Sequence, residues 1–201
     1  MDKWLIKTPE QIKNIRESWK YLNELLLKLK NEVQAGMTLI DLELYAEQYI
    51  SKHNLKWAFK WYQWFPANLC LSVNDCVVHW IPDNYVLKNG DLLKIDCWLI
   101  YNKWISDSAI SIVVGWDFNN QLGADLIETT KLALDLGLKE LWPNKSIYNY
   151  SKTVHQTMEK NNFKIIKTLT GHGVGNKVHE RPYIYNHPHP ETKNTILHPW
   201  M

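Results

Sequence analysis

The chain has 201 residues, 45% of them hydrophobic and 22% charged, which excludes an intrinsically disordered protein and leaves room for one domain or two small ones. Its 23 lysines and arginines against 21 aspartates and glutamates give a formal net charge of +2, too even for a protein built to coat nucleic acid. No apolar run is long enough to cross a membrane or serve as a signal core, and three cysteines without a CxxC pair fit a reduced cytoplasm.

The first predicted elements are helices. The sequence Thr8-Pro9-Glu10-Gln11 is typical of a capping box, and apolar residues at spacings of three and four then predict a long amphipathic helix that ends before Gly36. Thr38 with Asp41 indicates the start of a second helix, which closes at 52–54. Residues 57–68 are aromatic and irregular.

Short β-rich runs follow and predict strands over 69–73, 76–81, 91–101 and 105–114, the last two forming a hairpin around Asn102-Lys103. Helices are predicted from about 122 to 141 and from Ser146 onward, and a last strand over 163–169. Two helices followed by strands thus occur twice, which predicts one α+β domain over 1–201 with halves of about 8–115 and 117–201. Because the second half has few strands, we expect a truncated chain whose last strands are missing.

Two aspartates lie on the arms of the predicted hairpin. With the turn at Asn102-Lys103, Trp98 lies opposite Asp107, so Asp96 and Asp107 share a face as diagonal neighbours. Two carboxylates on one face repel unless a proton or cation lies between them, which indicates a metal or acid–base site. The alternative is that Asp96 has no special role and that Asp107 is an exposed residue at a strand end.

Three histidines could add to such a site. His172 lies between glycines, His179 follows seven residues later, and His79 stands in a β-type run. Glycine permits close backbone approach, so His172 is presented to a ligand or partner, although a lone histidine is more often an ordinary core or surface group. His187 and His189 alternate with prolines and are interpreted as a solvated loop.

Several segments together resemble the type I methionine aminopeptidases, and the resemblance covers essentially the whole chain in order. The substrate-pocket, metal-aspartate and histidine motifs are matched by residues 65–75, 78–83, 91–96, 106–109, 171–175 and 178–182. The resemblance implies a pita-bread fold, in which two pseudo-symmetric αβ halves surround a central antiparallel sheet, here with the second half incomplete. It also implies removal of the initiator methionine from nascent polypeptides, in the cytoplasm.

The resemblance assigns roles to particular residues. Asp96, Asp107 and His172 would be ligands of two divalent metal ions (Co, Mn, Fe or Zn) that activate water, and His179 and His79 would be catalytic and contact the substrate. Tyr62, Phe65 and Cys70 would line an apolar pocket for the methionine side chain. The implied partners are nascent-chain N-termini and the ribosome, with no membrane and no specific nucleic acid, and the protein is expected to be a monomer.

The chain also departs from the family pattern. Two glutamate ligands, one of them the expected general base, would lie beyond residue 201, so the chain as given is expected to be inactive; Glu180 and Glu191 do not match those positions. Two alternatives stay open. One is a non-catalytic pita-bread module that binds peptides or the ribosome, and the other is a peptidase of the Xaa-Pro aminopeptidase type.

Tryptophan is unusually frequent, with 11 residues against 8 glycines, whereas glycine usually makes up about 7% of a protein. Seven tryptophans stand where the family pattern has glycine: Trp19, Trp61, Trp64, Trp80, Trp98, Trp104 and Trp200. Trp104 closes the predicted hairpin, where we expect a positive φ, and Trp98 is expected on the face of Asp107. The hypothesis is that UGA codons meaning glycine in the source lineage have been translated as tryptophan; the alternative is an aromatic-rich variant pocket.

Overall fold

The computed structural model describes residues 6–199 and 201, and the chain divides into two compact units. The N-terminal unit comprises residues 13–124 and 175–178, and the C-terminal unit comprises residues 1–12, 125–174 and 179–201. Each unit is described by itself below. Among the described helices, none combines the length and the apolar character that a membrane span requires.

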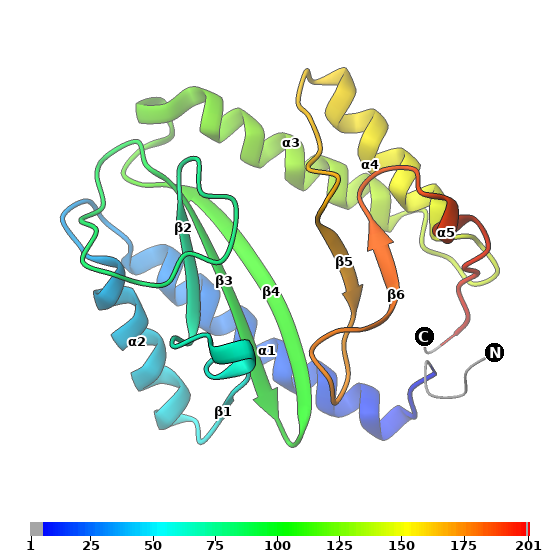
Figure 1. Cartoon of the computed structure of the whole chain (residues 1–201), viewed down its shortest axis with the longest axis horizontal. Helices are drawn as coiled ribbons and strands as arrows, with labels where there is room; N and C mark the ends of the chain where they lie inside the picture. Colours follow the sequence, from blue (N-terminus) through cyan, green and yellow to red (C-terminus); the bar gives the residue numbers. More distant parts are fainter. Residues whose placement is uncertain (1–5, 200) are drawn as a thin grey trace. The chain divides into compact units, whose positions relative to one another are not determined.

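Two helices form one layer of the N-terminal unit (Figure 1). Helix α1 (Pro9–Glu32), whose first turn belongs to the C-terminal unit, begins with the predicted capping box, in which Gln11 N donates to Thr8 Oγ1 and Thr8 N donates to Gln11 Oε1. Helix α2 (Leu39–Lys52) begins at Thr38, as predicted, and the structure adds a second capping box there, between Thr38 and Asp41. The hydrogen bonds from Thr38 lower the pKa of the Asp41 carboxyl.

An antiparallel four-stranded sheet forms the other layer. Its strands are β1 (Lys56–Trp57), β2 (Leu69–Val73), β3 (Leu92–Tyr101) and β4 (Trp104–Val113), and β3 pairs with all the others. The β3–β4 hairpin is the predicted one. Its positive φ angles belong to Asn102 and Lys103, whereas Trp104 already pairs with Tyr101, so the expected positive φ at Trp104 is wrong.

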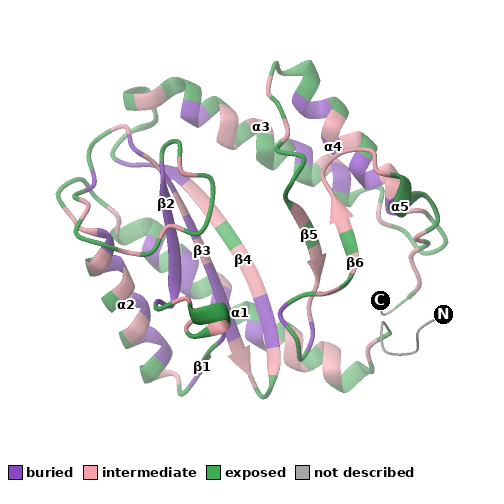
Figure 2. Ribbon diagram, viewed as in Figure 1, coloured by how far each residue is buried: buried purple, intermediate pink, exposed green. Residues whose placement is uncertain are grey.

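The two faces of this sheet have different roles. One face packs on α1 and α2 through alternate residues of β3, namely Leu93, Ile95, Cys97 and Leu99, which join the helices' leucines in the main core. The other face carries Asp96, Trp98 and Ile100 from β3 and Asp107 from β4. We call it the acid face. Figure 2 shows that β2 is buried along its length and that burial varies along β4.

The predicted strand over 76–81 does not form. Residues in this segment make scattered hydrogen bonds with β2 instead of a regular ladder. Leu71 N donates to Trp80 O and Cys76 N to Val73 O, and the other two bonds, from His79 N and Trp80 N, go to the side chains of Cys70 and Ser72. Val77 and Val78 are exposed, and His79 has a φ of 65°, which is incompatible with an extended strand.

The C-terminal unit has helices and a small hairpin. Helix α3 (Gln121–Leu138), whose first turn belongs to the N-terminal unit, follows a 3-10 turn (Asp117–Asn120). Helix α4 (Tyr148–Lys160), strands β5 (Thr170–Gly173) and β6 (Glu180–Tyr185), and the short α5 (Pro190–Lys193) complete it.

The predicted strand over 163–169 is irregular instead. Phe163 and Ile165 pack against the cluster formed by Ala133, Tyr150, Val154 and Met158, so the apolar alternation reflects burial against helices rather than pairing in a sheet. The strand begins only at Thr170.

Candidate active site

The two aspartates occupy the middle of the acid face. In the β3–β4 register Asp96 pairs with Ala109 and Trp98 pairs with Asp107, so the carboxylates are diagonal neighbours on one face, as predicted. Both residues are half-buried, and Asp107 lies inside β4 rather than at its end. The alternative of an exposed residue at a strand end is therefore wrong for Asp107.

A cluster of apolar side chains covers the acid face beside these carboxylates. We call it the aromatic cluster; it comprises Ala58, Phe59, Tyr62, Phe65, Cys70, Trp98, Ile100, Ile105 and Val178. The three residues expected to line the substrate pocket, Tyr62, Phe65 and Cys70, are thus brought together. The 3-10 turn Tyr62–Trp64 supplies Tyr62, and β2 supplies Cys70, which pairs with Asp96 across the sheet. Burial raises the pKa of the Cys70 thiol.

His79 lies at the margin of the same cluster. Its backbone N–H donates to Cys70 Sγ at 2.8 Å, which ties the exposed histidine to β2 in spite of its left-handed backbone. A non-glycine residue held at positive φ is uncommon and often marks a functional position. His79 therefore belongs with Asp96, Asp107 and the pocket residues in the N-terminal unit.

His172 and His179 lie together in the C-terminal unit. His172 is in β5, its Nδ1 lies 3.0 Å from the carbonyl oxygen of Gly173, and its ring contacts that of His179 edge-on with centroids 4.3 Å apart. Glycine is required beside it, because a Cβ at Gly173 would lie 2.7 Å from the Arg181 carbonyl oxygen. The glycine motif therefore serves to bring β5 and β6 close together.

The predicted metal ligands are distributed over both units. Asp96 and Asp107 belong to the N-terminal unit and His172 to the C-terminal unit. Within the described part of each unit, no three histidine, cysteine, aspartate or glutamate side chains are grouped closely enough to hold a metal ion. The chemistry of the aspartate pair still fits a divalent cation, since two neighbouring carboxylates supply hard oxygen donors and favour a positive charge between them.

Other residues of the C-terminal unit have structural partners. Glu180 forms an ion pair with Lys7, which sequence reasoning missed because 173 residues separate them. His189 caps α5 and stacks on Tyr185 with ring centroids 3.8 Å apart, so this segment is a loop, as predicted, but its histidines are half-buried instead of fully solvated. Burial lowers the pKa of the neighbouring His187.

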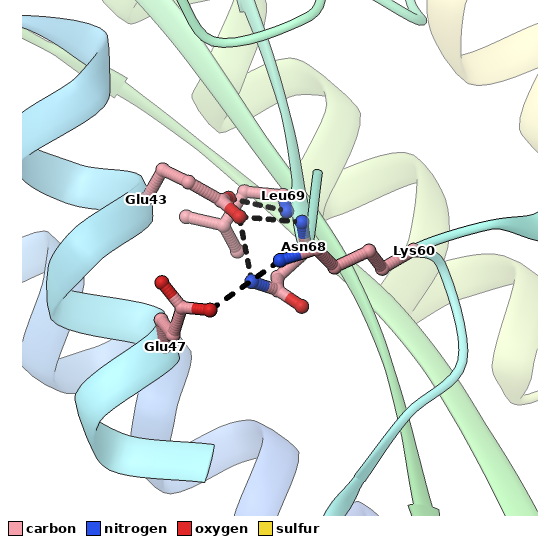
Figure 3. A network of polar contacts seen from close by, with 5 residues as sticks. All are labelled: Glu43, Glu47, Lys60, Asn68 and Leu69. Carbon is pink, nitrogen blue, oxygen red and sulfur yellow. Dashed lines mark hydrogen bonds and ion pairs between the residues drawn. The ribbon is translucent and has the colours of Figure 1, made fainter. Parts of the chain in front are cut away.

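A half-buried carboxylate fixes the start of β2. Glu43 of α2 accepts hydrogen bonds from Asn68 N, Asn68 Nδ2 and Leu69 N at 2.6–2.9 Å, and nearby Lys60 donates to Glu47 (Figure 3). This network places Cys70 two residues later. Sequence reasoning missed Glu43 because nothing in a helical periodicity separates an inward carboxylate from a solvated one.

Comparison with known proteins gives the relatives of the chain. The model of metallopeptidase family M24 matches residues 13–201. A methionine aminopeptidase of Clostridium perfringens is 35% identical over 186 residues, covering 92% of this chain and 74% of that protein. The methionine aminopeptidase of Borreliella burgdorferi is 35% identical over 202 residues, covering 100% of this chain and 79% of that protein.

Solved structures of related proteins have the same fold as this chain. The crystal structure of methionine aminopeptidase from Thermotoga maritima has a TM-score of 0.92 and 30% identity, with 98% of this chain and 78% of that chain covered. A prolidase from Pyrococcus horikoshii, at 18% identity and a TM-score of 0.80 over 98% of this chain and 54% of that one, shares the fold alone. The expected pita-bread fold is confirmed by these neighbours, and the family match over nearly the whole chain shows that the chain belongs to metallopeptidase family M24.

Proposed function

We propose that this chain is an aminopeptidase that removes the N-terminal methionine from nascent polypeptides. The observation that carries the proposal is the acid face of the N-terminal unit, where the Asp96–Asp107 pair lies beside an aromatic and thiol-lined cluster. A hydrolytic site for an apolar first residue needs such a combination, since the carboxylates act at the amide and the apolar cluster binds the side chain. Relatives at 30–36% identity carry the name methionine aminopeptidase.

Asp96, Asp107 and His172 are proposed to hold divalent metal ions. Carboxylate and imidazole donors suit Mn, Fe, Co or Zn, and such ions supply Lewis acidity and a reactive water at neutral pH. That two ions bind, and that they are ions of these metals, is part of the proposal.

The other residues act on the peptide itself. Tyr62, Phe65 and Cys70 would bind the methionine side chain, for which a polarizable apolar surface is suited. His79 and His179 would hydrogen-bond the scissile amide, His179 stabilising the developing negative charge on its oxygen. We also propose that the protein acts in the cytoplasm, near the ribosome, as a monomer.

Release of methionine from Met-Ala-Ser tests the proposal. The assay uses enzyme in excess over peptide with added Mn²⁺ or Co²⁺, so that a single turnover is detected, and it also tests the expectation that the chain as given is inactive. Methionine release that Asp96→Asn abolishes would support the proposal, and Glu47→Ala on the surface of α2 is the matched control. Peptide binding without any release of methionine would favour the non-catalytic module. Preferential cleavage of Ala-Pro peptides would favour a peptidase of the Xaa-Pro aminopeptidase type.

A further inference from the structure

Trp98 lies at the centre of the aromatic cluster. Its side chain is only 6% exposed, stacks on Phe59 with centroids 4.1 Å apart and an interplanar angle of 24°, and meets Tyr62 edge-on at 5.3 Å. Phe59 in turn contacts Phe65 at 4.7 Å. The indole therefore occupies the space among the aromatic side chains.

Trp98 lies beside the two carboxylates, on the part of the acid face that the first side chain of a peptide would reach. Trp98 follows Asp96 by two residues on the same face and pairs with Asp107 across the hairpin. A peptide whose first amide lies at the carboxylates would extend its first side chain along this face. The apolar side chains beside the carboxylates on this face are those of the aromatic cluster, among which the indole packs.

We propose that Trp98 is a specificity-determining residue, whose indole fills the space for the first side chain and so weakens the binding of peptides that begin with methionine. The inference rests on the proposed function and deepens it. Protein cores are close-packed, so an indole and a thioether cannot share one site. Truncation of a buried side chain leaves an apolar cavity that takes up a small apolar group.

The three cysteines provide an internal test of this arrangement. Cys70 is buried in the aromatic cluster, Cys97 is buried in the main core on the opposite face of the sheet, and Cys76 is half-exposed. In Trp98→Ala we expect Cys70 to react with iodoacetamide while Cys97 stays unreactive, which would show that the cluster has opened and the fold is kept. If Cys97 also reacts, the variant has unfolded and Trp98→Val, which keeps a strand-forming residue, replaces it.

The affinities of the wild type and of Trp98→Ala for two peptides test the role of Trp98. Burial of a methionine side chain in the opened cluster is expected to raise the affinity of Trp98→Ala for Met-Ala-Ser about tenfold or more over the wild type, with no change for Ala-Ala-Ser. Met-Ala-Ser, but not Ala-Ala-Ser, should also protect Cys70 from alkylation. Trp64→Gly, which removes an exposed tryptophan, is the matched control and should leave both affinities unchanged.

Two outcomes separate this inference from the proposed function. Equal affinity of wild type and variant for Met-Ala-Ser, or binding that leaves Cys70 unprotected, would overturn the role of Trp98 even if methionine is released. Selective binding and protection in the variant without methionine release from either protein would support the role of Trp98 and count against the aminopeptidase.

Discussion

Trp61 and Trp64 hold a backbone conformation that large L residues avoid. Their φ angles are 72° and 69°, and their side chains are 67% and 89% exposed, so little burial offsets the strain. These two positions fit the hypothesis that glycine codons were translated as tryptophan. The contacts of Trp80 are those of an ordinary tryptophan and give the hypothesis no support, because its Nε1 donates to Asp83 Oδ2 at 3.1 Å and its ring packs on Tyr85. Trp200 lies outside the described residues.

Replacing either strained tryptophan by glycine should stabilise the protein. We expect Trp61→Gly and Trp64→Gly each to raise the free energy of unfolding by about 1 kcal/mol, since glycine adopts positive φ without steric cost. Trp116→Gly is the matched control: Trp116 is 71% exposed but has a φ of −119°, so glycine there should only lose stability. Urea denaturation of the three variants measures this, and equal effects at all three sites would contradict it.

The cysteines should differ in reactivity in the wild type. Burial raises the pKa of Cys70 and, more strongly, that of Cys97. Since the thiolate is the reactive form, iodoacetamide at pH 8 should label the half-exposed Cys76 alone, as read by mass spectrometry of peptides. Labelling of Cys70 before unfolding would show that the aromatic cluster is open without any substitution.

At the scale of elements, the carboxylate of Glu43 joins α2 to β2. Glu43→Ala removes the acceptor of three N–H donors, and we expect a loss of about 2–3 kcal/mol in the free energy of unfolding. Glu47→Ala, one turn further along α2, removes only a partly exposed ion pair with Lys60, and its effect should stay below about 1 kcal/mol.

The stability difference between the wild type and Glu43→Ala should depend on pH. Burial raises the pKa of Glu43 above its ordinary value, so the folded state binds this proton more tightly than the unfolded state. The stability from this proton is fully present below the ordinary pKa and is lost as the pH rises through the folded pKa. The gap between wild type and Glu43→Ala should therefore widen as the pH falls from 7 toward 4.5; a gap that narrows would show that the hydrogen bonds outweigh burial.

Elements set by local patterns could be predicted from sequence, whereas those set by packing could not. The starts of α1 and α2 and the hairpin that aligns Asp96 with Asp107 depend on residues close in the chain, and all were predicted. The strand over 76–81 was wrong because apolar composition alone does not reveal the positive φ of His79. The strand over 163–169 was wrong because alternation does not tell a helix-packed segment from a paired one.

At the scale of the whole molecule, the first residues of the chain belong to the unit formed by its last ones. Lys7 and Glu180 form an ion pair whose side chains are 13% and 9% exposed. Such a pairing has no local signature in the sequence, because 173 residues separate the two side chains. Removing one partner of a buried pair leaves the other charge desolvated and uncompensated.

Lys7→Met should therefore destabilise the C-terminal unit selectively, by about 3 kcal/mol. Hydrogen exchange is expected to accelerate in β5 and β6, and the β3–β4 hairpin of the N-terminal unit should keep its protection. Adding Glu180→Gln should recover part of the loss, because the unpaired charge is then removed. Lys20→Met is the control, since its pair with Glu17 is exposed and worth less than about 1 kcal/mol. Faster exchange in both units alike would contradict a selective effect of the Lys7–Glu180 pair on the C-terminal unit.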